Sequence, residues 1–275
     1  MNRTLPEAFW INLARSAGRR KRFLERANSR KLVATRVEAV DGDDVASVRR
    51  AIRWSETTVR EAACIASHLR AIRLARLRGL ERALVLEDDT TFEPVDRFPD
   101  LWDAIDSALP ARFGIVALTI AQAPRVLDRH FAKEAPVMRL ARDGFWSTGA
   151  YVVDRTAMER LAEKFGEDEP FDVRSHRLRH DAYSLLMRSW SDDRTIDGPW
   201  VARVPLFSFE GDDSEIHPHH LDEHRVSRAF VHAHFADAWS SVHERRYGIR
   251  PTLRRGLAWL FPDRVARGPR ARATR

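Results

Sequence analysis

Short apolar runs alternate with helical segments along most of the chain, and this alternation constrains the fold more than any other feature. Each apolar run has the length of a buried strand, and turn residues separate it from its neighbours. Strands that alternate with helices are typical of an α/β sandwich around a mainly parallel sheet. We expect strands within residues 7–14, 32–42, 82–89, 112–120, 145–155 and 201–211, and helices within 15–30, 57–81 and 155–165.

The segment 57–81 is the strongest predicted helix. Ile65, Leu69, Ile72 and Leu77 recur at helical spacing, and Gly79 is expected to end the helix. A helix of this length with a repeating apolar stripe is expected to pack on the sheet.

Length and composition indicate one large domain, or one domain with appendages. The chain has 275 residues, and 44% of them are hydrophobic, which is enough for a sizeable core. The single cysteine, Cys64, excludes an intramolecular disulfide and fits a reducing compartment. The first residues show no signal-peptide pattern, and no apolar run reaches membrane-spanning length. We therefore expect a cytoplasmic protein.

The excess of positive charge is confined to the C-terminal end of the chain. The formal net charge is +7, and residues 245–275 alone carry ten arginines and one acid, so residues 1–244 sum to about −2. A nearly neutral body without an aromatic stacking motif argues against nucleic-acid binding. We expect a domain over 1–244 and an arginine-rich, partly helical tail over 245–275.

The tail admits two interpretations. Leu253, Leu257, Leu260 and Phe261 recur at helical spacing with arginines between them. Such a basic amphipathic pattern could rest on the anionic inner face of a membrane. The alternative is a final helix docked on the body.

Three consecutive carboxylates end the strand predicted within 82–89. In an extended chain Glu87 and Asp89 point to one side and Asp88 to the other. Two carboxylates at a strand end can hold Mg²⁺ or Mn²⁺, and the ion can neutralise a diphosphate leaving group. The alternative is a solvated loop or a helix cap.

Three other groups could carry chemistry, and each has a structural alternative. Arginines after the first strand could hold phosphate oxygens or form a solvated helix face. Cys64 and His68 share a helix face, but a buried structural cysteine is the favoured interpretation because no activating third group is evident. A late histidine cluster matches no tight zinc spacing, although one member could complete a metal site. The arginines are Arg15, Arg19, Arg20 and Arg22, and the histidines are His217, His219, His220, His224, His232 and His234.

Taken in order, these pieces resemble glycosyltransferase family 25, the lipooligosaccharide enzymes of β-1,4-galactosyltransferase type. The family's "INL-x-R" strand, "VDG" turn, "GC-x-x-SH" helix and "LEDD" strand end have counterparts at residues 11–15, 40–42, 64–68 and 86–89. "STGAYVVDRTAMERL" and "EPFDV" resemble two later segments of the family. One departure is Ala63, which stands where the family has glycine, so its side chain could prevent close approach of the backbone to a ligand there.

The resemblance implies a GT-A-like nucleotide-sugar fold and inverting transfer of a hexose, galactose or glucose, from a UDP-sugar to a saccharide acceptor such as lipopolysaccharide. It implies Mn²⁺ or Mg²⁺ at Glu87 and Asp89, with Asp88 nearby in the catalytic centre. Transfer needs a base for the acceptor hydroxyl, and Asp172 of "EPFDV" is the candidate. The residues implied to contact or position the nucleotide-sugar are Asn12, Arg15, Arg19, Asp41, Ser67 and His68.

Two other functions compete with this one. A non-catalytic relative could bind a nucleotide-sugar without turning it over, although the intact carboxylates argue against that. A Mg²⁺-dependent phosphotransferase would need a nucleophilic aspartate and a downstream lysine, and only Lys133 and Lys164 follow the acidic motif.

Overall fold

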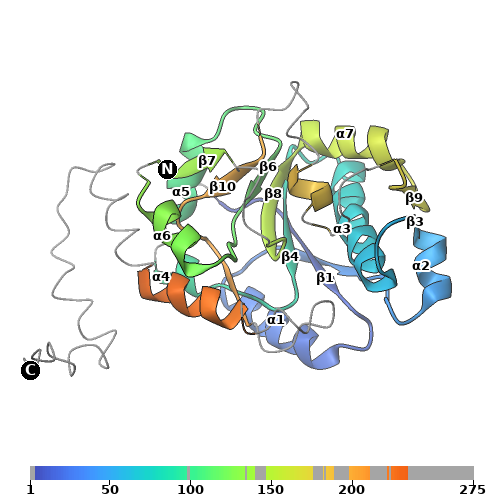
Figure 1. The fold of residues 1–275 in the computed structure, drawn as a ribbon, viewed down its shortest axis with the longest axis horizontal. Coiled ribbons are helices and arrows are strands. Elements are labelled where there is room, and N and C mark those ends of the chain that lie inside the picture. Colours follow the sequence, from blue (N-terminus) through green and yellow to red (C-terminus); the bar gives the residue numbers. More distant parts are fainter. Residues whose placement is uncertain are drawn as a thin grey trace, which may run out of the picture.

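A seven-stranded sheet forms the centre of the protein in a computed structural model (Figure 1). The structure describes residues 4–97, 100–133, 135–139, 147–175, 182, 184–188, 198–210, 222 and 224–234. The strand order is β2-β1-β4-β8-β6-β10-β7, and only β8 and β7 run against the others. The predicted α/β class with a mainly parallel sheet is therefore confirmed. The strands are β1 (Ala8–Asn12), β2 (Ala34–Glu38), β4 (Arg82–Glu87), β6 (Ile115–Ala117), β7 (Val137–Arg139), β8 (Ala150–Asp154) and β10 (Trp200–Ala202).

Helices lie on both sides of this sheet. Helix α3 contacts β1, β2 and β4, and α7 packs against α3. Figure 1 shows α4, α5 and α6 on the other side of the sheet and α1 beneath it. Two short pairs, β3 with β9 and β5 with β11, lie outside the central sheet. The remaining elements are α1 (Ala17–Ser29), α2 (Val45–Ala51), β3 (Ile52–Arg53), α3 (Val59–Leu77), β5 (Thr90–Thr91), α4 (Glu93–Arg97), α5 (Leu101–Ala108), α6 (Pro124–Phe131), α7 (Arg155–Phe165), β9 (Phe171–Asp172), a π-helical turn (Ser184–Arg188) and β11 (Ser208–Phe209).

Helix α3 begins and ends where local chemistry dictates. The Thr58 hydroxyl accepts from the Glu61 N–H at 3.2 Å, and the Glu61 carboxylate accepts from the Thr58 N–H at 2.9 Å, so the two residues form a capping box. Gly79 ends the helix with a φ of +71°, a conformation that costs a glycine little. Leu77, predicted to lie on the packed stripe, is instead exposed, because it follows Ile72 by five residues and so lies about 140° around the helix from it, whereas Ala75 is the buried residue of the last turn.

The direction of β8 decides which residues meet at the end of β4. Because β8 is antiparallel to β4, with Ala150 opposite Leu86, the residues that precede β8 lie beside those that follow β4. The N–H of Glu87 accordingly donates to the carbonyl of Gly149 at 2.9 Å. Strand periodicity in the sequence carries no information on this direction.

The strand predicted within 201–211 is two separate strands. β10 belongs to the central sheet, whereas β11 pairs with β5 directly after the acidic run. The chain between them passes the end of the interior strand β6, where the Leu206 N–H donates to the Leu118 carbonyl at 2.9 Å.

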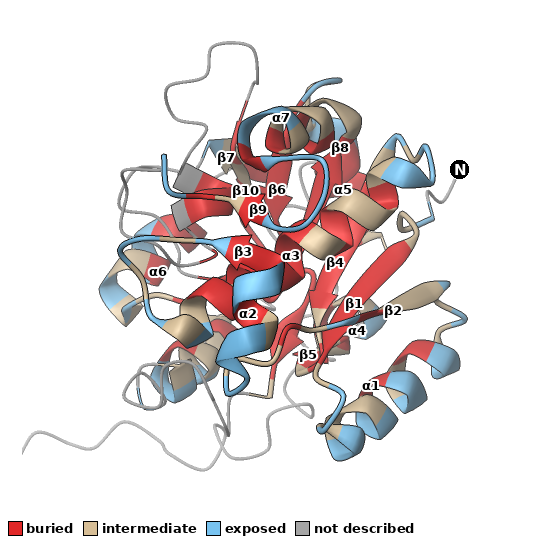
Figure 2. Ribbon diagram, turned by 90° about the vertical axis from the view of Figure 1, so that its right-hand side faces the viewer, coloured by how far each residue is buried: buried red, intermediate tan, exposed pale blue. Residues whose placement is uncertain are grey.

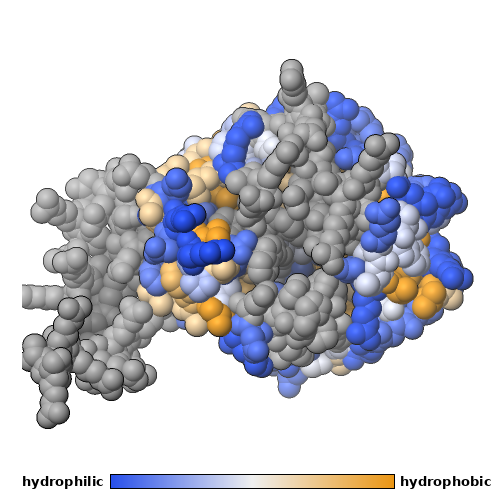
Figure 3. Space-filling view, in the orientation of Figure 1, coloured by the Kyte–Doolittle hydropathy of each residue, from blue (hydrophilic) through white to orange (hydrophobic). Residues whose placement is uncertain are grey.

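The core lies between the sheet and its helices, and charged side chains cover the outside. Figure 2 shows most strands and the inner helix faces as buried, with β2 mainly intermediate and the outer faces of α1 and α2 exposed. Trp10 of β1 stacks on Phe23 of α1 at 4.3 Å between ring centroids, which anchors α1 to the sheet. In Figure 3 much of the visible surface that belongs to described residues is hydrophilic. In the described ranges no helix has both the length and the apolar character needed to cross a membrane.

Candidate active site

The three carboxylates of the acidic run lie at the carboxyl end of the central strand β4. Glu87 is the last residue of that strand, and Asp88 and Asp89 form the turn to β5. A fourth carboxylate arrives from far along the chain, because the N–H of Glu210 donates to the carbonyl of Asp89 at 2.9 Å. Four carboxylates therefore gather at one end of the sheet.

Asp88 is buried and held from two directions. Its carboxylate accepts from Nδ2 of Asn12 at 2.7 Å and from Nη1 of Arg19 at 3.3 Å. Burial raises the pKa of Asp88, while the Asn12 hydrogen bond and the Arg19 charge oppose that rise. Asn12 in turn accepts from Nε of Arg36 at 3.1 Å, so its orientation is fixed. We call Asn12, Arg19 and Asp88 the Asp88 clamp, and it joins the ends of β1 and β4 to α1.

Glu87 faces a different set of partners. The Thr148 hydroxyl donates to Oε1 of Glu87 at 2.9 Å, and Nε2 of His68 lies 3.5 Å from the same oxygen. Burial by itself would raise the pKa of Glu87, but the hydrogen bond and charge of His68, the Thr148 hydrogen bond and the Arg19 charge together lower it. Glu87 is therefore ionised at neutral pH and directed by fixed neighbours.

Of the three carboxylates, Asp89 has the fewest partners to balance its negative charge. Burial, with the negative charges of Glu87 and Asp88, raises the pKa of Asp89 to about 7, and Glu210 adds to the repulsion. Within the described part of the chain, its carboxylate has no hydrogen bond or ion pair. This excess of negative charge is the feature of the site that favours binding of a cation.

The carboxylates of Glu87 and Asp89 suit a hard divalent ion only if water or a bound substrate completes the coordination of that ion. In the described ranges no group of three or more His, Cys, Asp or Glu residues is arranged to hold a metal. Mg²⁺ and similar ions commonly bind through one or two carboxylates together with water and substrate phosphates, rather than in a cage made by protein alone. Glu87 and Asp89 suit that mode because both supply carboxylate oxygens and Asp89 has none of its charge neutralised by hydrogen bonds.

Arg15 and Asp41 belong to an exposed ionic network at the turn after β2. Arg15 pairs with Asp41 at 2.9 Å and with Asp43 at 3.1 Å, and Arg60 of α3 pairs with Asp43 at 2.8 Å. Gly42 is required in this turn, because a Cβ there would lie 2.9 Å from the Cα of Arg60. The predicted nucleotide contacts of Arg15 and Asp41 stay predictions.

Ser67 and His68 have well-defined structural partners. The Ser67 hydroxyl accepts from the Val40 N–H at 2.9 Å and donates to the Ala63 carbonyl at 2.7 Å, so it ties α3 to the turn after β2. His68 is buried and reaches Glu87, as described above. Of the residues proposed for the nucleotide-sugar, Asn12, Arg19 and His68 directly contact the acidic run, whereas the hydrogen bonds given above for Arg15, Asp41 and Ser67 are with other residues.

Asp172 lies on β9, which pairs with β3 outside the central sheet. Arg174 holds its carboxylate with a contact of 2.5 Å, and this hydrogen bond and charge lower the pKa of Asp172 to about 2. A carboxylate with so low a pKa accepts a proton weakly at neutral pH. No contact within the described ranges joins Asp172 to the acidic run, and its role as the base stays a prediction.

The other residues considered in the sequence are engaged in structural contacts. Arg22 and Arg26 hold the carboxylate of Glu210 at 3.2 and 2.8 Å, so these arginines brace α1 against the segment after β11. His234 stacks on Phe230 with centroids 4.0 Å apart. His224 packs edge-on against Phe209, His232 lies 3.5 Å from Glu93, and Arg20 donates to the Ala14 carbonyl. His217, His219 and His220 and the tail 245–275 lie outside the described residues.

Sequence reasoning missed Thr148, Tyr151 and Glu210 as site residues. Thr148 and Tyr151 belong to the "STGAY" segment, which resembles a segment of the family but contains no predicted site residue. Only the antiparallel pairing of β8 places them beside β4. No signal in the sequence could have identified Glu210, which depends on the pairing of β11 with β5.

Comparison with known proteins identifies the family of this chain. The model of "Glycosyltransferase family 25 (LPS biosynthesis protein)" matches residues 5–173, which include β1, the acidic run and β8. The chain therefore belongs to glycosyltransferase family 25. A search of curated proteins found no significant match. The architecture is α/β with a mainly parallel central sheet, and its finer assignment to the GT-A-like class stays a prediction from the resemblance.

Two solved structures show a remote likeness. One is mannose-1-phosphate geranyltransferase from Thermus thermophilus, with 15% identity and a TM-score of 0.32 over 58% of this chain and 60% of that one. The other is mouse xyloside xylosyltransferase 1 in its apo form, with 17% identity and a TM-score of 0.23 over 57% of this chain and 61% of that one. The match spans about three fifths of each of those chains.

Proposed function

We propose that the protein transfers a hexose, galactose or glucose, from a UDP-sugar to a saccharide acceptor of the lipopolysaccharide type, with inversion at the sugar. Family membership supports glycosyl transfer in lipopolysaccharide biosynthesis. The observation that carries the proposal is the pair Glu87 and Asp89 at the carboxyl end of β4, where ligands of open α/β sheets bind.

Glu87 and Asp89 would hold Mn²⁺ or Mg²⁺ against the diphosphate of the donor. The bound ion would neutralise charge on the departing nucleoside diphosphate. Asp89 supports this role because no described residue hydrogen-bonds to or pairs with its carboxylate, and Glu87 supports it through the neighbours that fix its orientation. The Asp88 clamp keeps the third carboxylate engaged with Asn12 and Arg19, so we assign Asp88 to shaping the turn beside the reacting groups.

Arg15, Arg19, Asp41 and Ser67 are proposed to position the nucleotide around this turn. Arg19 supports such a role by placing a fixed positive charge beside Asp88, at the end of the sheet where the diphosphate would sit. Asp172 remains the proposed base on the resemblance alone. If it is the base, Asp172→Asn should lower kcat while leaving the binding of UDP unchanged. An unchanged kcat would refute the role of Asp172 as the base.

The decisive test is a panel of UDP-hexoses with Mn²⁺, comparing the parent protein with Asp89→Ala. We expect transfer or donor hydrolysis by the parent and a loss of about 100-fold or more in the variant, because a lost metal ligand removes several kcal/mol of charge stabilisation. Glu163→Ala serves as a matched control, since among the described residues Glu163 pairs with Arg160 alone, on the surface of α7. Transfer by Asp89→Ala at the parent rate would refute the metal assignment. A parent inactive with every UDP-hexose would favour a non-catalytic relative.

We also propose a cytoplasmic location, with the basic tail 245–275 touching the anionic face of a membrane. The arginines and the helical spacing of apolar residues in the tail support this contact. Full-length chain should sediment with anionic vesicles more than a chain ending at residue 244. Equal sedimentation of the two chains would refute the proposed membrane contact.

A further inference from the structure

Two hydrogen-bonding groups converge on one oxygen of Glu87. Thr148 donates to Oε1 at 2.9 Å, and Nε2 of His68 lies 3.5 Å from the same Oε1. Among the residues that the structure describes, none is hydrogen-bonded to Oε2. The carboxylate is thus held at one oxygen and left available at the other.

His68 is itself held by a buried phenol. The Tyr151 hydroxyl lies 3.1 Å from Nδ1 of His68, and both side chains are almost fully inaccessible to solvent. If the Tyr151 O–H donates to Nδ1 of a neutral imidazole, the proton of the imidazole lies on Nε2 and points to Glu87. This assignment gives a partner to the Tyr151 hydroxyl and to both ring nitrogens of His68.

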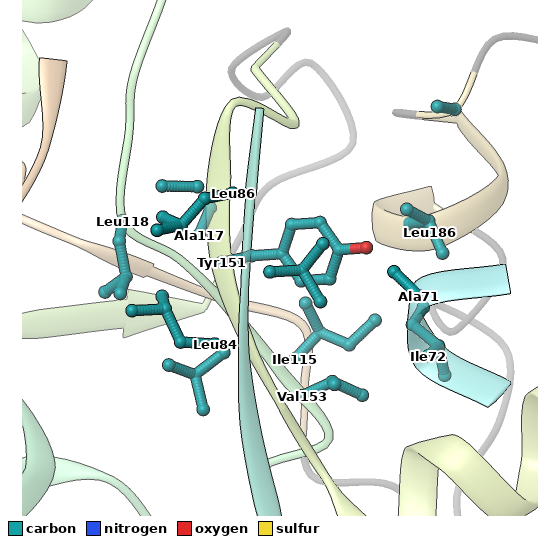
Figure 4. Close-up of a cluster of buried hydrophobic side chains, with 14 of the residues drawn as sticks. Ala71, Ile72, Leu84, Leu86, Ile115, Ala117, Leu118, Tyr151, Val153 and Leu186 are labelled. Atoms are coloured by element: carbon teal, nitrogen blue, oxygen red, sulfur yellow. The ribbon is translucent and has the colours of Figure 1, made fainter. Parts of the chain in front are cut away.

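The sheet register explains why Tyr151 can reach α3. Tyr151 stands opposite Val85 in the β8–β4 pair, so it shares a sheet face with Val85 and, two residues on, with Glu87. Figure 4 shows Tyr151 on the side of Ala71 and Ile72 of α3, with its hydroxyl directed away from the sheet, while Leu84 and Leu86 lie on the opposite side. His68 is one turn before Ala71 and Ile72 on the same helix.

The Tyr151 hydroxyl lies in apolar surroundings, so its presence there needs an explanation. The Tyr151 ring packs in a cluster with Ile72, Ile115, Val153 and Leu186, where a phenylalanine would serve packing equally well (Figure 4). A buried hydroxyl in an apolar cluster costs free energy unless it is hydrogen-bonded. Its contact with His68 therefore indicates a role in the line of contacts that ends at Glu87.

We propose that Tyr151, His68 and Thr148 are positioning residues that fix Oε1 of Glu87 and direct Oε2 toward the divalent ion and the diphosphate. We call these three residues the Glu87 support. This inference rests on the proposed function, because it deepens the role of Glu87 there. Thr148 and Tyr151 both come from the "STGAY" segment, so a single stretch of chain acts on Glu87 directly and through His68. Partners behind a metal ligand set its orientation and basicity.

The test measures Mn²⁺ binding from the free-ion EPR signal, with Mn²⁺ alone and with inorganic diphosphate present. Thr148→Val removes the direct donor at nearly constant volume, and Tyr151→Phe removes only the phenol oxygen. We expect Mn²⁺ affinity to fall about 10-fold for Thr148→Val, at the lower end of the range for outer-shell partners, and about 3- to 10-fold for Tyr151→Phe, which acts one contact further away. Thr148→Ser keeps the hydroxyl and should restore binding.

Two comparisons separate positioning from general loss of stability. Ser227→Ala removes a buried hydroxyl that accepts from the Gln122 N–H at 3.0 Å outside the site, and it should leave Mn²⁺ affinity unchanged. In a Glu87→Gln background, Tyr151→Phe should cause no additional loss, because the carboxylate that the Glu87 support directs is absent.

The outcomes distinguish this inference from the function on which it rests. If the parent binds Mn²⁺ through Glu87 but Thr148→Val and Tyr151→Phe bind it equally well, the positioning role is refuted and the metal site stands. If the folded parent binds no Mn²⁺ under either condition, the metal site is refuted and the positioning role with it. Losses in both variants, with rescue by Thr148→Ser and no further loss in the Glu87→Gln background, support the positioning role.

Discussion

Replacing Asn12 with alanine tests whether the Asp88 clamp holds a buried charge. The substitution removes the 2.7 Å hydrogen bond to the Asp88 carboxylate and leaves Arg19, at 3.3 Å, as the remaining clamp partner. A hydrogen bond to a charged group contributes about 1.5–3 kcal/mol, and loss of the acceptor for Arg36 adds to the cost. We expect Asn12→Ala to lower the free energy of unfolding by about 2–3 kcal/mol at pH 7.

Urea unfolding followed by circular dichroism measures this loss, and an Asp88→Asn background supplies the control. With a neutral amide at position 88, Asn12→Ala should cost only about 1 kcal/mol, the usual value for a neutral hydrogen bond. The coupling between the two positions is then about 1–2 kcal/mol, as found for residues in direct contact.

The pH dependence of the same variant gives a second check. Burial raises the pKa of Asp88 in the folded protein, so folding is favoured by protonation of this group, and its ionised form is the one that needs Asn12. The loss caused by Asn12→Ala should therefore shrink as the pH falls and Asp88 takes up a proton. A loss below about 0.5 kcal/mol at pH 7, or an equal loss in the Asp88→Asn background, would show that the clamp does not hold a charge.

Two further predictions concern stability. The pKa of Asp89, about 7 in the folded protein, lies above its ordinary value of 3.8, so the stability that this group contributes at low pH is lost as the pH rises through 7. Asp89→Asn should therefore be more stable than the parent at pH 8 without metal and gain little at pH 4. Urea unfolding measures this difference, and an equal free energy of unfolding for variant and parent at pH 8 would contradict the prediction. Gly42→Ala should destabilise the protein by about 1–3 kcal/mol, because its Cβ would lie 2.9 Å from the Cα of Arg60; an unchanged melting temperature would mean that the turn adapts freely.

Local patterns in the sequence determined the class of fold and the strands of the central sheet other than β7, but not helices α2, α4, α5 and α6. Apolar runs and helical periodicity predicted β1, β4, β8, α3 and α7 because strand and helix formation depend on neighbours a few residues apart. The acidic run was also placed correctly at the end of β4, since a buried strand must stop where consecutive carboxylates need water or partners.

Tertiary structure decided which side chains meet that run. The antiparallel direction of β8 brings Thr148 to Glu87 and Tyr151 to His68, and the pairing of β11 with β5 brings Glu210 beside Asp89. Strand direction and pairing arise from contacts between segments tens of residues apart, which periodicity does not encode. The sequence by itself therefore determined a carboxylate turn at a strand end, whereas only the assembled sheet decided that Asp88 is clamped, Glu87 is directed and Asp89 is left with its charge uncompensated.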